Sequence, residues 1–334
     1  REEIGRGGMG RVLAAEDPAL GRVVAVKVLH DGTSDGADRA RAATEARVTA
    51  QLEHPHIVPV YDVGEDARGA PWFVMRRIEG RSLRELLDAF AQGSEPAWSL
   101  RRLLGAFLSV CRAVEYAHSR GVLHRDLKPS NVMLGSFGEI YVLDWGVSRS
   151  LGGAEEPTSA FPPVVTGLHA GLTRVGASLG TPGFMSPEQA AGRGDLDVRS
   201  DVYSLGAILY ELLTLVPAFD GPSPEAIVFA SVLGSPVPPR ARAPLRGIPE
   251  DLDALCMQAL ERAPDRRFPS VAAFADALDA ALDGAGRRER AREAMEGALD
   301  ARAQQLALRD EGALLDADRE TLRARVLPST PVDA

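Results

Sequence analysis

The short segment HRDLKPSN, residues 124–131, carries the residue types that phosphoryl transfer requires. It places a carboxylate (Asp126), a cation two residues later (Lys128) and an amide able to bind a metal ion (Asn131) on one stretch. Transfer to a hydroxyl needs an acceptor for the alcohol proton, a positive charge beside the transferred group and an anchor for Mg²⁺. A polar surface loop is the alternative, but a fixed string of this kind rarely arises by chance. The segment therefore predicts a phosphotransfer site.

A glycine cluster, GRGGMGRV, stands at residues 5–12. Without Cβ atoms, Gly5, Gly7 and Gly10 would let backbone N–H groups approach phosphate oxygens closely. A flexible β-turn explains such a string equally well. A dinucleotide-binding fold would need a strand before the cluster and a helix after it, but strand-like and turn-like residues follow. The dinucleotide interpretation is therefore rejected.

Three further charged residues, Lys27, Glu45 and Asp144, lie in or at the ends of expected strands and helices. Lys27 ends the run VAVK in an expected strand, residues 23–29, and a buried ammonium without a partner costs several kcal/mol. Glu45 lies in an expected helix, residues 38–52, although a solvated helix face is its simpler explanation. Asp144 follows the apolar residues 140–143 and precedes Trp145 and a glycine. A carboxylate at the end of a buried strand is well placed to bind a metal ion.

Together these segments resemble the eukaryotic-like (Hanks-type) serine/threonine protein kinases, in their bacterial branch. The likeness rests on the motifs above and on GTPGFMSPE, residues 180–188, and it covers roughly residues 1–283. It implies that ATP donates its γ-phosphoryl group to Ser or Thr hydroxyls of protein substrates, with Mg²⁺, or alternatively Mn²⁺, as the metal ion. Trp145 departs from the family, which usually has phenylalanine there, and puts the local packing in question.

The resemblance also assigns roles to residues of this chain. Asp126 would accept the proton, Lys128 would stabilise the transferred group, and Asn131 and Asp144 would hold the metal ion. Lys27 would contact the phosphates. The remaining positions implied for catalysis and ATP binding are Glu45, Thr181, Gly5, Gly7, Gly10, Val12, Ala25, Met75, Arg76, Ile78 and Met133. Replacing Asp126 or Lys27 by alanine is expected to abolish phosphorylation without unfolding the chain.

Structural and regulatory roles follow in the same way. Glu188 would form a buried ion pair with Arg267, and the adjacent Arg266 is the alternative partner. Asp201 would accept hydrogen bonds from backbone N–H groups of residues 124–131. Arg125 precedes the expected base, as in kinases whose activation loop is phosphorylated, and a phosphate could order the loop against it. The candidate phosphorylation sites are Thr173, Ser178 and, as a weaker choice, Thr166.

Composition sets the remaining bounds. The chain has 334 residues, of which 45% are apolar and 25% charged, and its net charge of −9 gives no support for nucleic-acid binding. The two cysteines favour reduced thiols and a cytoplasmic location. No apolar run is long enough to span a membrane. Since the chain begins without methionine, we expect a fragment, and the full-length protein could be tethered to a membrane.

The pattern of elements predicts an α+β, bilobal protein kinase fold. It includes helices at residues 83–90, with Ser82 as the N-cap, at 100–119, at 271–282 and at 285–326. We expect a small antiparallel β lobe with one helix at residues 1–78, a larger and mainly helical lobe at 79–283, and a charged helical extension at 284–334. Leucines spaced seven residues apart in the extension, at positions 308, 315 and 322, leave both a homodimer and a solvated linker helix open.

Two other functions compete with this interpretation. A pseudokinase would bind ATP or act as a scaffold without catalysis, but every catalytic position matched here holds the residue that catalysis needs. A small-molecule kinase of related fold would lack the segment that ends in Ser186-Pro187-Glu188.

Overall fold

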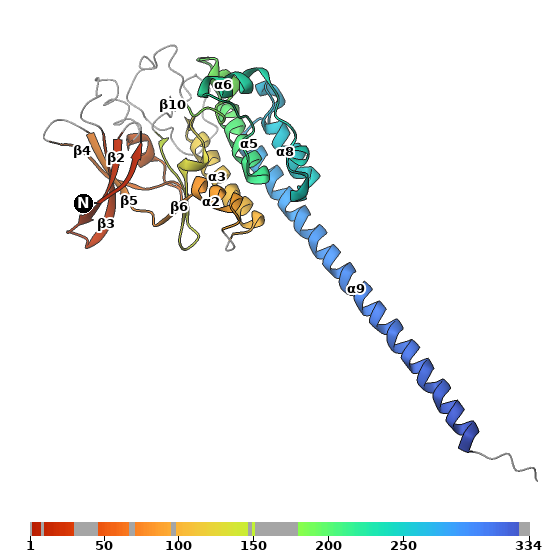
Figure 1. Ribbon diagram of the computed structural model, residues 1–334. Helices are drawn as coiled ribbons and strands as arrows, with labels where there is room; N and C mark the ends of the chain where they lie inside the picture. Colours follow the sequence, from red (N-terminus) through yellow and green to blue (C-terminus); the bar gives the residue numbers. More distant parts are fainter. Residues whose placement is uncertain are drawn as a thin grey trace, which may run out of the picture. The chain divides into compact units, whose positions relative to one another are not determined.

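The computed structural model describes residues 2–7, 10–29, 46–66, 71–94, 98–145, 149–150 and 180–326. It divides the chain into two compact units, residues 1–281 and 282–334. The first unit has an antiparallel sheet near its N-terminus and a helical part that contains α3 (Leu100–Ser119), α5 (Val198–Thr214) and α8 (Glu250–Ala259) (Figure 1). The predicted α+β, bilobal architecture is thereby confirmed.

The N-terminal lobe is a five-stranded antiparallel sheet with the order β1-β2-β3-β5-β4. Its strands are β1 (Glu2–Gly7), β2 (Gly10–Asp17), β3 (Arg22–Leu29), β4 (Val60–Glu65) and β5 (Pro71–Arg76). The β-branched residues of β3 explain its central place, because such side chains pack well on a half-buried pleated surface. Strand β1 was not predicted, because its glycines and charged residues give no apolar alternation. Residues 46–51 are helical, within the helix expected at 38–52.

A small sheet, β6-β8-β9, positions the segment that was expected to be catalytic. It consists of β6 (Gly80–Ser82), β8 (Val132–Gly135) and β9 (Ile140–Val142). The 3₁₀ turn η1 (Pro129–Asn131) comes directly before β8. Strand β7 (Val122–Leu123) comes directly before the segment of residues 124–131 and pairs with β10 (Arg149–Ser150). Helix α2 (Leu83–Ala91) begins at a capping box formed by Ser82 and Glu85, as its N-cap was predicted.

Helices form the rest of the first unit. The predicted helix at 100–119 is α3 (Leu100–Ser119), and α5 (Val198–Thr214) runs through the core, with nearly all of its residues buried. Leu215 has φ 63° and ends α5 in a left-handed cap. The other helices and 3₁₀ turns are α4 (Pro187–Ala190), α6 (Pro224–Leu233), α7 (Pro239–Arg242), η3 (Pro244–Arg246), α8 (Glu250–Ala259) and η4 (Pro264–Arg266).

The last helix is α9 (Val271–Val326), where the sequence suggested one helix at 271–282 and another at 285–326. Leu308, Leu315 and Leu322 are 68%, 64% and 61% exposed, so within the described residues nothing covers this leucine series. Among the described residues, no helix has the length and apolar character needed to cross a membrane. The boundary expected at residue 283 stays a prediction.

Candidate active site

The expected catalytic carboxylate is held from both sides. Thr181 Oγ1 donates a hydrogen bond to Asp126 Oδ1 at 2.8 Å, and Lys128 Nζ donates to Asp126 Oδ2 at 2.7 Å. Lys128 also donates to Thr181 Oγ1 at 2.7 Å, which closes a three-membered ring of contacts. Because both oxygens of Asp126 are engaged, the carboxylate has one orientation, and the Lys128 ammonium stands directly beside it.

The backbone around Asp126 is clamped by a buried aspartate. Asp201, in the first turn of α5, accepts hydrogen bonds from the backbone N–H groups of His124 and Arg125, each at 2.8 Å. Arg125 has φ 69°, a left-handed conformation that is unfavourable for a residue with a side chain. Gln189 donates to the Arg125 carbonyl at 2.8 Å, so both backbone groups of this strained residue are fixed.

Asp201 itself has a further buried partner, His118 of α3. His118 Nε2 lies 2.7 Å from Asp201 Oδ2, and the two side chains are 8% and 0% exposed. Burial alone would raise the pKa of Asp201, but the hydrogen bond and charge of His118 and the backbone donors lower the pKa below its ordinary value. Asp201 therefore remains an ionised acceptor for the loop at neutral pH.

The neutral imidazole of His124 lies between the loop that contains Asp126 and the strand end that precedes Asp144. Its Nδ1 accepts from the Asp126 N–H at 3.3 Å, which leaves Nε2–H to donate to the Leu143 carbonyl at 3.0 Å. Burial lowers the pKa of His124 on balance, against the opposing charge of Asp201. The imidazole thus ties the loop of Asp126 to the strand end that precedes Asp144.

The two expected metal ligands lie at the same end of the β8–β9 hairpin. The Leu143 N–H donates to the Asn131 carbonyl at 2.8 Å, and Asp144 is the next residue along the chain. Asn131 Nδ2 donates to the Asp126 carbonyl at 2.9 Å, which orients its amide. One carboxylate oxygen and one amide oxygen form a hard donor set that suits Mg²⁺, so these residues fit the metal ion. Among the described residues, no group of three or more His, Cys, Asp or Glu side chains is arranged to hold a metal ion.

Asp144 also joins the two lobes. Lys27 Nζ of β3 donates to Asp144 Oδ1 at 2.8 Å, although the two residues are far apart in sequence. Asp144 has φ 58°, another left-handed residue in this site. Burial would raise the pKa of Asp144, but the Lys27 ammonium lowers it on balance. The carboxylate is therefore ionised at neutral pH and able to bind a cation.

Trp145, which departs from the family pattern, fills the core beneath this site. The indole is fully buried, and its ring centroid lies 4.6 Å from that of His124. Its Nε1–H has no hydrogen-bond partner in the part of the chain that the structure describes. Tryptophan therefore supports His124 by packing.

The apolar positions implied for adenine lie on β2, β3, β5 and β8. Ala25 is 3% exposed and stands opposite Met75 in the β3–β5 register, whereas Val12 stands opposite Lys27 in the β2–β3 register. Met133 is half-buried on β8. Arg76 ends β5, and Ile78 follows it in a segment without regular structure. Gly5, Gly7 and Gly10 belong to the β1–β2 hairpin, with Gly7 opposite Gly10.

The segment of residues 180–188 is fixed to the catalytic loop. Gly180 has φ 130°, and a Cβ on it would lie 2.6 Å from Met185 Cγ, so a side chain is excluded there. Ser186 caps α4 through a capping box with Gln189, the residue that also donates to the Arg125 carbonyl. The Ser-x-x-Gln spacing could have predicted this cap from the sequence.

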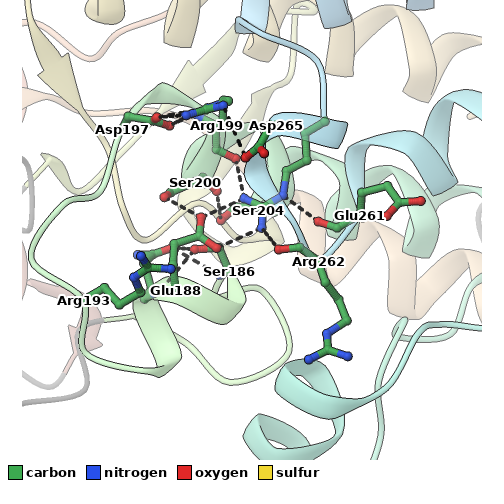
Figure 2. A network of polar contacts seen from close by, with 12 residues as sticks. Ser186, Glu188, Arg193, Asp197, Arg199, Ser200, Ser204, Glu261, Arg262 and Asp265 are labelled. Atoms are coloured by element: carbon green, nitrogen blue, oxygen red, sulfur yellow. Dashed lines mark hydrogen bonds and ion pairs between the residues drawn. The ribbon is translucent and has the colours of Figure 1, made fainter.

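Glu188 forms the buried ion pair with Arg267, not with Arg266. Arg267 Nη1 and Nη2 donate to the two Glu188 oxygens at 2.7 and 2.8 Å, and Ser200 Oγ adds a hydrogen bond at 2.8 Å. The remaining Arg267 donors reach the backbone carbonyls of Arg199, Glu261 and Arg262. Figure 2 shows these groups converging with Glu188 on one cluster. Every N–H of the guanidinium is therefore satisfied.

Several expected residues fall outside the described ranges. They are Glu45, Thr166, Thr173 and Ser178. Conversely, sequence reasoning missed His118, Ser200 and Gln189, which support the site without belonging to any of its motifs. For His118 and Ser200 no sequence signal existed, because their partners lie on other elements.

Comparison with known proteins agrees with this geometry. The family model described as protein kinase domain matches residues 1–277. Similar relatives include the probable serine/threonine-protein kinase SCO3848 of Streptomyces coelicolor, which is 40% identical over 285 residues, covering 84% of this chain and 39% of the relative. Serine/threonine-protein kinase PknB of Mycobacterium tuberculosis is 38% identical over 276 residues, covering 81% of this chain and 40% of PknB.

A third relative is also a bacterial protein. Serine/threonine-protein kinase PknD of Chlamydia felis is 37% identical over 289 residues, covering 84% of this chain and 30% of that protein. The chain thus spans less than half the length of these curated relatives.

Proposed function

The chain belongs to the protein kinase family, in its bacterial serine/threonine branch, and we propose that it transfers the γ-phosphoryl group of ATP to Ser and Thr hydroxyls of proteins. The observation that carries this proposal is the contact set of Asp126, whose two oxygens meet Thr181 and Lys128. Asp126 would orient the substrate hydroxyl and accept its proton, while Lys128 would offset the charge on the transferred group.

Members of this family use ATP with a divalent metal ion, generally Mg²⁺. In this chain, Asp144 and Asn131 would hold Mg²⁺, or Mn²⁺ in its place, and the ion would neutralise phosphate charge. Lys27 would contact the phosphates from β3, and its present contact with Asp144 supports the idea that both residues face one nucleotide. Gly5, Gly7 and Gly10 would cover the phosphates. Adenine would lie among Val12, Ala25, Met75 and Met133, with its edge at the main chain of Arg76 and Ile78.

The experiment is a transfer assay with radiolabelled ATP, MgCl₂ and a generic basic protein as acceptor. Incorporation of label into the acceptor's serine and threonine residues supports the proposal. A protein that binds MgATP, yet transfers nothing to any protein acceptor or to itself, would be a pseudokinase. The positions of Lys27, Asp126 and Asp144 favour catalysis, because each holds the residue that the chemistry needs.

Regulation would use the segment between Asp144 and Glu188. Phosphorylation of Thr173 or Ser178 by a second copy of the kinase would add a group of charge about −1.5 to −2, which the Arg125 guanidinium could order. Phosphopeptide mapping of active protein tests this proposal, and an unmodified segment in fully active protein would contradict it.

We further propose that the kinase domain occupies residues 1–283 and that residues 284–334 form a helical extension. The exposed leucines Leu308, Leu315 and Leu322 could form a homodimer contact through this extension, with a solvated linker helix as the alternative. Since the domain would use ATP and contains two buried free thiols, Cys111 and Cys256, we place it in the cytoplasm. A longer protein that contains this domain could still be tethered to a membrane.

A further inference from the structure

A buried glutamine outside the motifs of the site contacts the catalytic loop. Gln189 of α4 is 4% exposed, and its side-chain amide is bound at both ends. Its Oε1 accepts hydrogen bonds from the Ser186 N–H at 3.2 Å and from the Ser186 hydroxyl at 3.1 Å. Its Nε2 donates to the backbone carbonyl of Arg125 at 2.8 Å. The contacts with Ser186 form the capping box of α4, but the contact with Arg125 reaches a different segment, and the cap does not require it.

The Arg125 carbonyl belongs to the peptide group that leads into Asp126. Gln189 binds the oxygen of this group, and His124 Nδ1 accepts a hydrogen bond from its N–H, that of Asp126, at 3.3 Å. Because a peptide group is planar, these two contacts fix its rotation. That rotation sets the direction in which the Asp126 side chain leaves the backbone. Gln189 therefore acts on the orientation of the Asp126 carboxylate through the backbone.

The backbone conformation that Gln189 holds is unfavourable for Arg125. Arg125 has φ 69°, in the left-handed region. A residue with a side chain stays in this region only where its surroundings hold it there. The Arg125 N–H is bound by Asp201 at 2.8 Å, so relaxation of Arg125 would rotate the carbonyl side, which Gln189 holds.

We propose that Gln189 is a positioning residue for phosphoryl transfer, which holds the peptide group between Arg125 and Asp126 so that Asp126 faces the substrate hydroxyl. The inference rests on the proposed function, because Asp126 has this task only in a kinase. Thr181 Oγ1 binds the Asp126 carboxylate at 2.8 Å, and Gln189 binds the backbone directly before Asp126. The segment of residues 180–188 and α4 thus hold Asp126 through its side chain and through its backbone.

The competing explanation is that Gln189 serves only the cap of α4. Gln189→Glu keeps two oxygens for the N–H and the hydroxyl of Ser186, and Ser-x-x-Glu is itself a capping box, but a carboxylate cannot donate to the Arg125 carbonyl. Gln189→Met keeps the length of the side chain and loses both kinds of contact. The cap alone therefore predicts wild-type activity for the glutamate variant and a loss for the methionine variant.

Steady-state kinetics separate the two explanations. A threonine peptide that the wild type phosphorylates is used to measure kcat, and KM for ATP, of the wild type and both variants, with the melting temperature of each protein. We expect kcat to fall about tenfold or more in both variants while KM for ATP stays within about twofold, because misplacement of a catalytic group by about 1 Å can cost roughly 10²-fold. Gln258→Met, at an exposed glutamine of α8, is the control and should match the wild type. A wild-type kcat in Gln189→Glu would overturn the inference.

The strained backbone of Arg125 supplies a second test. Asparagine adopts the left-handed conformation more readily than arginine, so Arg125→Asn should need the contact with Gln189 less. Gln189→Glu should therefore lower kcat about tenfold in the wild-type background and by less than about threefold in the Arg125→Asn background. Equal factors in the two backgrounds would contradict the inference. If Gln189→Glu does not fold, Gln189→Met takes its place in both backgrounds.

Hydrogen exchange gives a readout without turnover. Amide exchange in a peptide that covers residues 124–131 should be faster in Gln189→Glu than in the wild type, because the loop has lost an anchor, and Gln258→Met should leave it unchanged. Unchanged exchange in Gln189→Glu would overturn the inference. A wild type that transfers no phosphate would refute the proposed function instead, and the exchange measurement would still decide whether Gln189 holds the loop.

Discussion

Arg267 and Glu188 form a bidentate ion pair in which Nη1 and Nη2 donate to the two carboxylate oxygens at 2.7 and 2.8 Å. Their side chains are 0% and 8% exposed. Loss of one partner would leave the other charge buried and unpaired, which costs about 3–5 kcal/mol. We therefore expect Arg267→Ala to lower the free energy of unfolding by about that amount, measured by urea denaturation.

The adjacent arginine supplies the control for this prediction. Arg266 is exposed, so Arg266→Ala should change the free energy of unfolding by less than about 0.5 kcal/mol. Equal losses in the two variants would show that the pair with Glu188 is not the source of the effect.

Acid should weaken the fold through two buried carboxylates. Burial opposes ionisation of Glu188 and Asp201, but the Arg267 pair lowers the pKa of Glu188 below 4.5, and His118 with the loop N–H groups lowers that of Asp201 below 3.8. Since each folded-state pKa is lowered, the stabilisation is present above the ordinary pKa values and is lost as the pH falls below them. The free energy of unfolding should thus stay level from pH 7 to about 5 and fall below about 4.5.

Replacement of Glu188 by glutamine removes one of these titrations. Urea denaturation of Glu188→Gln should show a lower stability at pH 7 and a shallower decline between pH 5 and 3 than the wild type. A decline as steep as that of the wild type would assign the acid sensitivity to other groups.

Thr181 should act on the rate more than on nucleotide affinity. Its hydroxyl bridges Asp126 and Lys128, so Thr181→Val leaves the carboxylate free to turn away from the substrate hydroxyl. Misplacement of a catalytic group by about 1 Å can cost roughly 10²-fold, and we expect kcat to fall about tenfold to a hundredfold while KM for ATP stays within about twofold. Thr181→Ser keeps the hydroxyl and should retain most of the activity. Equal kcat values for the serine and valine variants would contradict this role.

Some features of the molecule followed from local sequence alone. Helix α3 was predicted with its observed bounds, because its apolar positions repeat at helical spacing between Ser99 and a glycine. The motif residues came from short strings in which neighbours in sequence are neighbours in space, as with Asp126, Lys128 and Asn131.

Other features depend on contacts that no local pattern encodes. The choice of Arg267 over Arg266 is made by the direction in which the backbone after η4 presents each side chain. The pair of Arg84 on α2 and Glu211 on α5 joins two helices whose residues are far apart in sequence, and neither residue stands in a motif. Strand β1 was missed because its glycines and charged residues do not show the apolar alternation on which strand prediction depends.

The most direct test of the account is phosphoryl transfer by Asp126→Asn at saturating MgATP. Asparagine keeps the shape of the side chain but cannot accept a proton as a carboxylate does, so the account predicts a fall in kcat of about 10²–10⁴-fold. The shift in melting temperature caused by MgATP should stay as in the wild type, because Lys27, Asn131 and Asp144 remain. A variant that transfers phosphate at the wild-type rate would contradict the assignment of Asp126 and the mechanism that depends on it.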